Sequence, residues 1–142
     1  MSVRKGDQAE GKLKVINYMR NLLKYTYERV KSDTFPKADR WIMAKAIWDA
    51  ANRAHGYILR ANGIRVETKA DAEERLLCEK LAIGSLDELI ALIDTCYMCG
   101  TISADRCEFW TKLATDTQNL TKGWLKSQRA EYRDFLKTEL GN

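Results

Sequence analysis

The sequence predicts an all-α protein, an antiparallel up-down-up-down four-helix bundle in a single domain over residues 1–142. Composition favours helices: apolar residues make up 45% and charged residues 31% of the chain, with one Pro and eight Gly. Apolar residues recur at helical spacing in four segments. The connections between these segments are short, which places consecutive helices antiparallel. We expect residues 1–10 to form a flexible arm.

The first helix is predicted from an apolar row at spacings of three and four, and it ends near Ser32. Its members are Ile16, Met19, Leu23, Tyr27 and Val30. Pro36, the single proline, falls in the segment "SDTFPKADRW" that follows. Proline is tolerated in the first turn of a helix, where its missing N–H has no intrahelical partner. We therefore expect Pro36 to begin the second helix and to mark a joint between two helices of one domain.

The second helix carries two neighbouring apolar rows. The first contains Trp41, Ala44, Trp48, Ala51, His55 and Ile58, and the second Met43, Ile47, Ala50, Ala54, Tyr57 and Ala61. An apolar arc this wide is expected to be covered from two sides. This predicts a homo-oligomer with Trp41, Trp48 and Tyr57 in its interface, because large aromatic residues anchor interfaces. We expect Asn62-Gly63 to close the helix with a left-handed cap.

The third and fourth helices are predicted from their caps and their apolar rows. Thr68 and Asp71 have the spacing of a capping box, and the third helix closes at Gly100 with the row Ala72, Leu76, Ile83, Leu86, Ile90, Ile93 and Tyr97. Ser103 is a suitable N-cap for the last helix. Its core face begins with Trp110, Leu113, Thr117, Leu120 and Trp124.

Residues that carry catalytic or metal chemistry are few. The one histidine, His55, lies on an apolar row and is expected to be a hydrogen-bonded core or interface residue. Cys96, Cys99 and Cys107 could approach one another, but a fourth zinc ligand is missing, since Cys78 lies about 27 Å along the helix from Cys96. A metal-binding sensor is kept as an alternative. We expect a protein that is not an enzyme and takes no cofactor or metal.

Basic residues are more organised than any catalytic group. Lys122, Lys126, Arg129, Arg133 and Lys137 follow helical spacing in the last helix and form what we call the basic edge, about 22 Å long. Shorter rows follow the first helix (Arg20, Lys24, Lys31) and the second (Lys45, Arg53, Arg60, interrupted by Asp49). All of these except Lys45 are predicted to contact nucleic-acid phosphates. A solvated helix face is the alternative for each row. Tyr132 is the one aromatic residue interleaved with the basic edge, so base stacking is not indicated and contact with backbone phosphates is the expected mechanism.

The charge distribution also separates the third helix from the rest. Residues 67–100 carry eight acidic and three basic residues, although the whole chain has a net charge of +4. We expect this acidic helix to pack against the basic helices of a neighbouring protomer and to set the register of an assembly. The chain has no run of 18 apolar residues and no signal-peptide core, so we expect a cytoplasmic protein with no membrane partner.

Several segments resemble, in their order, the accessory variability determinant of diversity-generating retroelements. They are "YMRNLLKYTYERV", "FPKADR", the Asn-Gly that ends the second helix, "GTISADR" and "LTKGWLKSQR", within residues 13 to 130. The same order resembles the wider four-helix group of ribosomal-RNA intervening-sequence proteins. Lys126 and Arg129, after Trp124, match the basic ending of the family, and Lys37 matches the basic residue after the joint proline.

The resemblance implies a non-enzymatic protomer of a barrel-like homopentamer. Such an assembly binds the retroelement reverse transcriptase and its template RNA, or an RNA/DNA hybrid, and supports mutagenic cDNA synthesis. The alternative is a structural or protein-interaction bundle of the intervening-sequence type that has no direct contact with nucleic acid.

Overall fold

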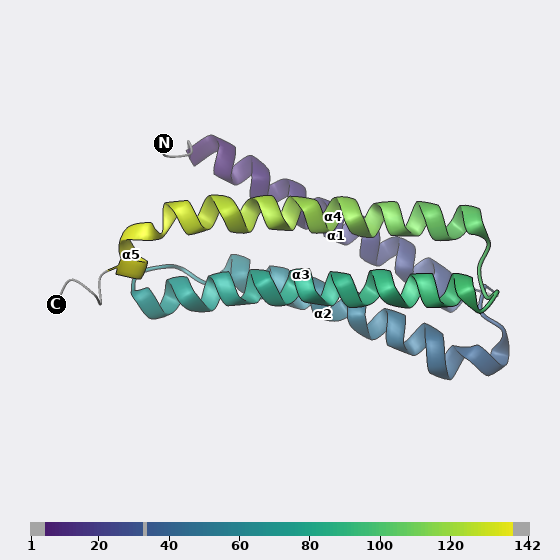
Figure 1. Cartoon of the computed structure of the whole chain (residues 1–142). Helices are drawn as coiled ribbons and strands as arrows, with labels where there is room; N and C mark the ends of the chain where they lie inside the picture. Colours follow the sequence, from purple (N-terminus) through teal and green to yellow (C-terminus); the bar gives the residue numbers. More distant parts are fainter. Residues whose placement is uncertain (1–4, 33, 138–142) are drawn as a thin grey trace.

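The computed structural model describes residues 5–32 and 34–137, and every regular element in them is helical. Of the four long helices, α3 and α4 run side by side, while α1 crosses obliquely behind α4 and α2 passes obliquely behind α3 (Figure 1). Their bounds are α1 Lys5–Lys31, α2 Lys45–Gly63, α3 Lys69–Met98 and α4 Ala104–Glu131, followed by the short α5 Arg133–Lys137. The predicted all-α class is confirmed. Residues 5–10, predicted to be part of an arm, extend α1, and residues 1–4 lie outside the described part.

The joint between α1 and α2 is longer than the sequence indicates. Pro36 precedes a 3-10 turn, Lys37–Asp39, instead of lying in the first turn of α2, and its carbonyl accepts a 2.8 Å hydrogen bond from the N–H of Asp39. A π-helical turn, Arg40–Ala44, comes next. Because a π turn closes with an i to i+5 bond, the 3.6-residue period of α2 does not continue back to Trp41. Trp41 consequently lies off the buried row and is 80% exposed.

The end of α2 differs from its prediction. Ile64, directly after Gly63, is extended (φ −84°, ψ 115°), so the chain leaves the helix towards Thr68 without a left-handed residue. Among the described residues only Gly100 has a positive φ, 77°. The left-handed cap predicted at Asn62-Gly63 is therefore wrong. Gly100 does terminate α3, where the N–H of Thr101 donates back to the carbonyl of Cys96 at 2.9 Å.

The caps predicted for the other two helices are confirmed. The Oγ1 of Thr68 accepts a hydrogen bond from the N–H of Asp71 at 3.2 Å, and the Asp71 carboxylate accepts one from the N–H of Thr68 at 3.1 Å. A hydrogen bond from the N–H of Glu67 to the same carboxylate, and after it the two bonds with Thr68, lower the pKa of Asp71. Ser103 accepts from the N–H of Arg106 at 3.1 Å and begins α4.

The core lies between all four long helices. In the two apolar rows of α2, Trp41 is exposed and Trp48, His55 and Tyr57 are half-buried, but six members are fully buried within one protomer: Ile47, Ala50, Ala51, Ala54, Ile58 and Ala61. Four of these are alanines, and their small side chains allow α1 and α3 to approach α2 closely. Two apolar rows therefore do not by themselves require a partner subunit. In the same core the Nε1 of Trp110 donates to the Oγ1 of Thr26 at 3.1 Å.

A smaller core cluster fixes the end of α4. It is formed by Ala72 and Leu76 of α3, Leu125 of α4, and Tyr132. Tyr132 turns inward between α4 and α5 (φ −94°, ψ 13°), so the last helix stops at Glu131 instead of continuing to Lys137. None of the helices described here has the length and the hydrophobicity of a membrane span.

Candidate nucleic-acid interface

The basic edge occupies the outer side of the second half of α4 and continues onto α5. Lys122, Lys126 and Arg129 are exposed on α4, because Trp124, Leu125 and Gln128 take the inward positions between them. Arg133 and Lys137 are also exposed, but they lie on α5. The edge is thus one group of three cations and one group of two, separated by the turn at Tyr132.

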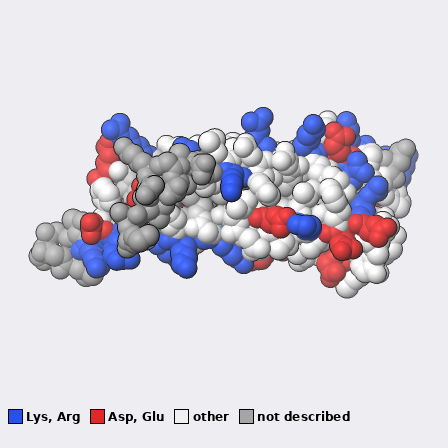
Figure 2. All heavy atoms as spheres, turned by 90° about the horizontal axis from the view of Figure 1, so that it is seen from above, with Lys and Arg blue, Asp and Glu red and all other residues white. Residues whose placement is uncertain are grey.

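No cation of the basic edge forms an ion pair with another described residue. Residues 117–130 contain no acidic residue, whereas the first half of α4 carries acids and pairs Lys112 with Asp116 at 2.7 Å. Figure 2 shows this separation: blue side chains follow the lower edge of the view near the α5 end, and most red side chains gather towards the other end. The edge is therefore a row of cations that form no ion pair with a described acid, although Glu73 and Glu74 border the same hollow as Arg129.

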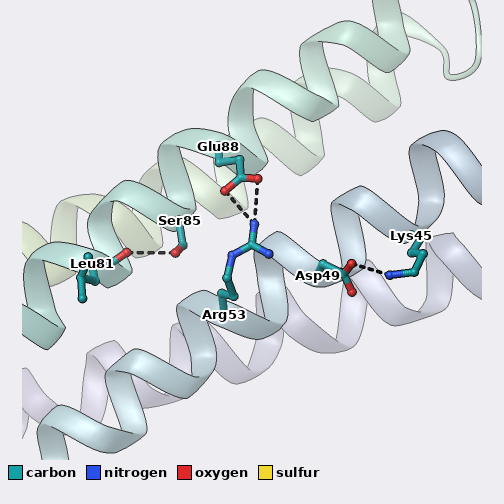
Figure 3. A network of polar contacts seen from close by, with 6 residues as sticks. All are labelled: Lys45, Asp49, Arg53, Leu81, Ser85 and Glu88. Atoms are coloured by element: carbon teal, nitrogen blue, oxygen red, sulfur yellow. Dashed lines mark hydrogen bonds and ion pairs between the residues drawn. The ribbon is translucent and has the colours of Figure 1, made fainter.

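The basic row of α2 is neutralised by its neighbours. Arg53 donates from Nη2 to both carboxylate oxygens of Glu88 at 2.7 Å, and Lys45 contacts Asp49 at 2.8 Å (Figure 3). Further along, Arg60 contacts Glu74 at 3.0 Å. Glu74 and Glu88 belong to α3, so these acids pair with cations of the same protomer. We call the surface formed by these three ion pairs the paired face. On it, the side chains of Arg53 and Arg60 are exposed, but each is held in an ion pair with a glutamate of α3.

The basic row of α1 borders a groove. Arg20 and Lys24 line a hollow of about 750 Å³ between α1 and α2, together with Tyr27, Trp48 and His55. Burial, and to a smaller extent the charge of Arg20, lowers the pKa of His55. Lys31 lies outside this α1–α2 groove, with its Nζ 5.1 Å from the centroid of the Tyr27 ring. Arg20 and Lys24, two of the predicted phosphate contacts, thus line the same groove as two aromatic rings.

The three aromatic residues predicted for an oligomer interface differ in how exposed their side chains are. Trp41 and Trp48 border one shallow hollow of about 350 Å³ with Val30 and Ala44, next to the α1–α2 groove. Ile42, 71% exposed, follows Trp41 on the same π turn. Tyr57 is half-buried and packs against the core of its own protomer. Of the three residues, Trp41 is consequently the most exposed, and with Ile42 it presents the two most exposed large apolar side chains among the described residues.

The thiols are separated by burial. Cys96 is buried, which raises the pKa of its thiol to about 11, whereas Cys99 is exposed and Cys107 half-buried. Within residues 5–32 and 34–137, no group of three His, Cys, Asp or Glu side chains is arranged to hold a metal ion. Tyr132, the one aromatic candidate for stacking on a base in the last helix, is buried, which agrees with the expectation that the basic edge does not stack on bases.

A polar cluster that the sequence patterns did not predict lies beneath the basic edge. The guanidinium of Arg75 donates to Gln128 and to the carbonyl of Ile64, both at 2.9 Å, and lies over the rings of Trp124 and Tyr132. These contacts tie α3 to the end of α4.

Glu79, one turn along α3, is the unusual member of this cluster. It is fully buried, 3.8 Å from Arg75, and neither carboxylate oxygen has a hydrogen-bond partner among the described residues. Burial raises the pKa of Glu79 to about 8. A signal was present in the sequence: the apolar row of α3 passes from Leu76 to Ile83, and Glu79 occupies the skipped inward position.

Comparisons with protein-family models, curated proteins and solved structures return no match to this chain. The function is therefore argued from the placement of its charges and aromatic rings.

Proposed function

We propose that this protein is a non-enzymatic RNA-binding accessory protein of a diversity-generating retroelement. In this proposal it acts in the cytoplasm, as an up-down-up-down bundle that binds the reverse transcriptase and the template RNA and so supports mutagenic cDNA synthesis. One observation carries the RNA-binding part: the cations of the basic edge are exposed and have no acidic partner among the described residues. The retroelement role rests on the sequence resemblance.

The geometry of the edge suits phosphate contact. Lys122, Lys126 and Arg129 succeed one another by three or four residues, which is a rise of about 4.5 to 6 Å per step and comparable to phosphate spacing along a strand. Such contacts bind the backbone and carry no direct sequence information. We therefore expect binding led by the shape of the RNA and strongly dependent on salt.

The experiment that tests this part is fluorescence anisotropy with a labelled, structured RNA between about 50 and 300 mM salt. Three to five phosphate contacts predict that the logarithm of the affinity falls with the logarithm of salt with a slope of roughly −3 to −5. An absence of binding at the lowest salt would contradict the proposal. It would favour a protein-interaction bundle that reaches nucleic acid only through a partner, a role that the exposed Trp41 and Ile42 also suit.

The assembly is proposed to be a homo-oligomer, a pentamer by resemblance, with Trp41 at its interface. A tryptophan that is 80% exposed contributes little to the fold of its own protomer, so W41A should lower the subunit number while the melting temperature of the helices changes little. Sedimentation equilibrium measures the subunit number. The control F109A removes another exposed aromatic side chain and should leave assembly intact. If W41A keeps the wild-type subunit number, Trp41 is not the anchor.

A further inference from the structure

The α1–α2 groove combines groups that the sequence keeps apart. Arg20 and Lys24 come from α1, and Trp48 and His55 come from α2, more than twenty residues later. Asn17 and Asn21, one turn apart on α1, add amide groups to the same lining. The volume of about 750 Å³ lies in the usual range for sites that bind small molecules. The groove therefore has the size and the mixed lining of a ligand site.

Its positive charge is not compensated. Neither Arg20 nor Lys24 forms an ion pair with any residue that the structure describes, in contrast to Arg53 on the neighbouring face, which is bound by Glu88. Among the described residues, no acidic side chain lines the groove. Two adjacent cations without an acid form a binding site for an anion, and phosphate is the common anion that carries an organic group.

Its aromatic rings supply a second kind of contact. Tyr27 is 49% exposed, and its ring lies 5.8 Å from that of Trp48, edge to face. Exposed aromatic rings beside cations are the arrangement with which proteins hold unpaired bases, because a base stacks on the ring while its phosphate is held by Lys or Arg. Asparagine amides can then donate to and accept from the edge of a base.

We propose that the α1–α2 groove binds a nucleoside phosphate, with the base on Tyr27 and Trp48 and the phosphate on Arg20 and Lys24. This inference rests on the function proposed above: the nucleoside phosphate belongs to an unpaired segment of the bound RNA. The molecule then has two RNA surfaces: the basic edge holds the backbone of structured RNA, and the groove holds a single-stranded base. A free mononucleotide is the other source of the same chemistry.

The test uses the full chain and three probes: a labelled nine-nucleotide oligo(A), a labelled twelve-base-pair RNA duplex, and AMP as competitor. R20Q/K24Q and, separately, Y27L should each weaken oligo(A) binding roughly tenfold, since stacking and paired phosphate contacts are each of that size. Both variants should leave duplex affinity within about twofold. The control K12Q/K14Q removes two charges of α1 outside the groove and should change neither affinity by more than about twofold.

The outcomes separate the inference from the proposed function. No loss for either probe overturns the groove as a base site and leaves duplex binding by the basic edge standing. Equal losses for oligo(A) and duplex also overturn the groove as a base site, and they show that the groove cations contribute to duplex binding. Groove-dependent oligo(A) binding without any duplex binding supports the groove and contradicts the basic edge. Displacement of oligo(A) by micromolar AMP identifies a free nucleotide as the ligand, whereas displacement only at millimolar AMP identifies the RNA segment.

Discussion

The paired face of α2 and the basic edge of α4 and α5 begin from similar sequence patterns and end in opposite electrostatic states. Each has cations at helical spacing and exposed on the surface. On the paired face, acids of α3 or of α2 itself bind all three cations; on the basic edge no described acid binds any of the five. A row of cations in a sequence therefore shows how many positive charges a helix face carries. The acids on the same and neighbouring helices determine which of these cations are free to bind a phosphate.

The difference arises on α3, whose acids point in different directions. Glu74 and Glu88 lie on the side that faces α2, where each meets an arginine at the surface. Glu79 lies on the side that faces the end of α4, but it is buried, and its negative form would have to be held in the core. A carboxyl that remains protonated does not neutralise Arg129, the edge cation that acts on it, so Arg129 keeps its charge.

The largest effect should come from removing the three edge cations of α4. K122Q/K126Q/R129Q should lower the affinity for structured RNA roughly 100-fold at 100 mM salt, since each phosphate contact is worth about 1 kcal/mol, and should reduce the salt slope by about three. Anisotropy titrations at several salt concentrations measure both quantities. Stability should change little, because all three side chains are exposed.

The matched control is K45Q/R53Q/R60Q, which removes the same number of charges from the paired face. Because those cations are already bound to acids, we expect at most about a threefold loss of affinity. Equal losses in the two triple variants would mean that net charge governs binding, and the distinction between the two surfaces would then fail.

A second test concerns the acid beneath the edge. Glu79 keeps its proton in the folded chain up to about pH 8, while the unfolded chain releases it near 4.5. Its pKa is raised by folding, so the folded state binds the extra proton between these values, and the free energy of unfolding falls as pH rises through this window. Arg75, Arg129 and Glu131 are the charged groups that act on it.

The variant E79Q keeps the shape of the side chain but replaces its ionisable carboxyl group with a neutral amide. Its free energy of unfolding should be close to that of the wild type at pH 5 and exceed it by roughly 3 kcal/mol at pH 8, because a pKa difference of one unit is worth about 1.4 kcal/mol. Urea unfolding followed by tryptophan fluorescence at the two pH values measures the difference. E108Q, which removes an exposed carboxylate, should follow the wild type at both. A constant gap between E79Q and wild type would show that Glu79 is ionised in the folded protein.

Sequence patterns predicted the helices well where local chemistry decides the structure. The Thr68 capping box, the Ser103 cap and the stop at Gly100 all depend on residues within one or two turns, and all three are present. The errors lie where tertiary packing decides. The π turn shifts Trp41 out of phase with α2, and the inward turn of Tyr132 divides the last helix in two.

The candidate site was less predictable than the helices. Spacing alone placed Lys122 and Lys126 on one exposed edge, but it could not show that Arg53 meets Glu88, because that contact joins residues 35 positions apart on different helices. The juxtaposition of Lys24 with Trp48 has the same origin. Contacts between helices depend on their relative rotation, which a periodic pattern in one helix does not determine.

The smallest effect is expected from removing the acids of the paired face, which would leave its arginines unpaired like the cations of the basic edge. E74Q/E88Q leaves Arg60 and Arg53 without their acids, so affinity for structured RNA should rise about two- to fivefold and the salt slope should steepen. D94N/E108Q also removes two exposed carboxylates but releases no ion-paired cation, and it should raise affinity less. An equal rise in both variants would assign the gain to net charge, whereas a rise confined to E74Q/E88Q would show that pairing alone keeps the α2 row from binding RNA.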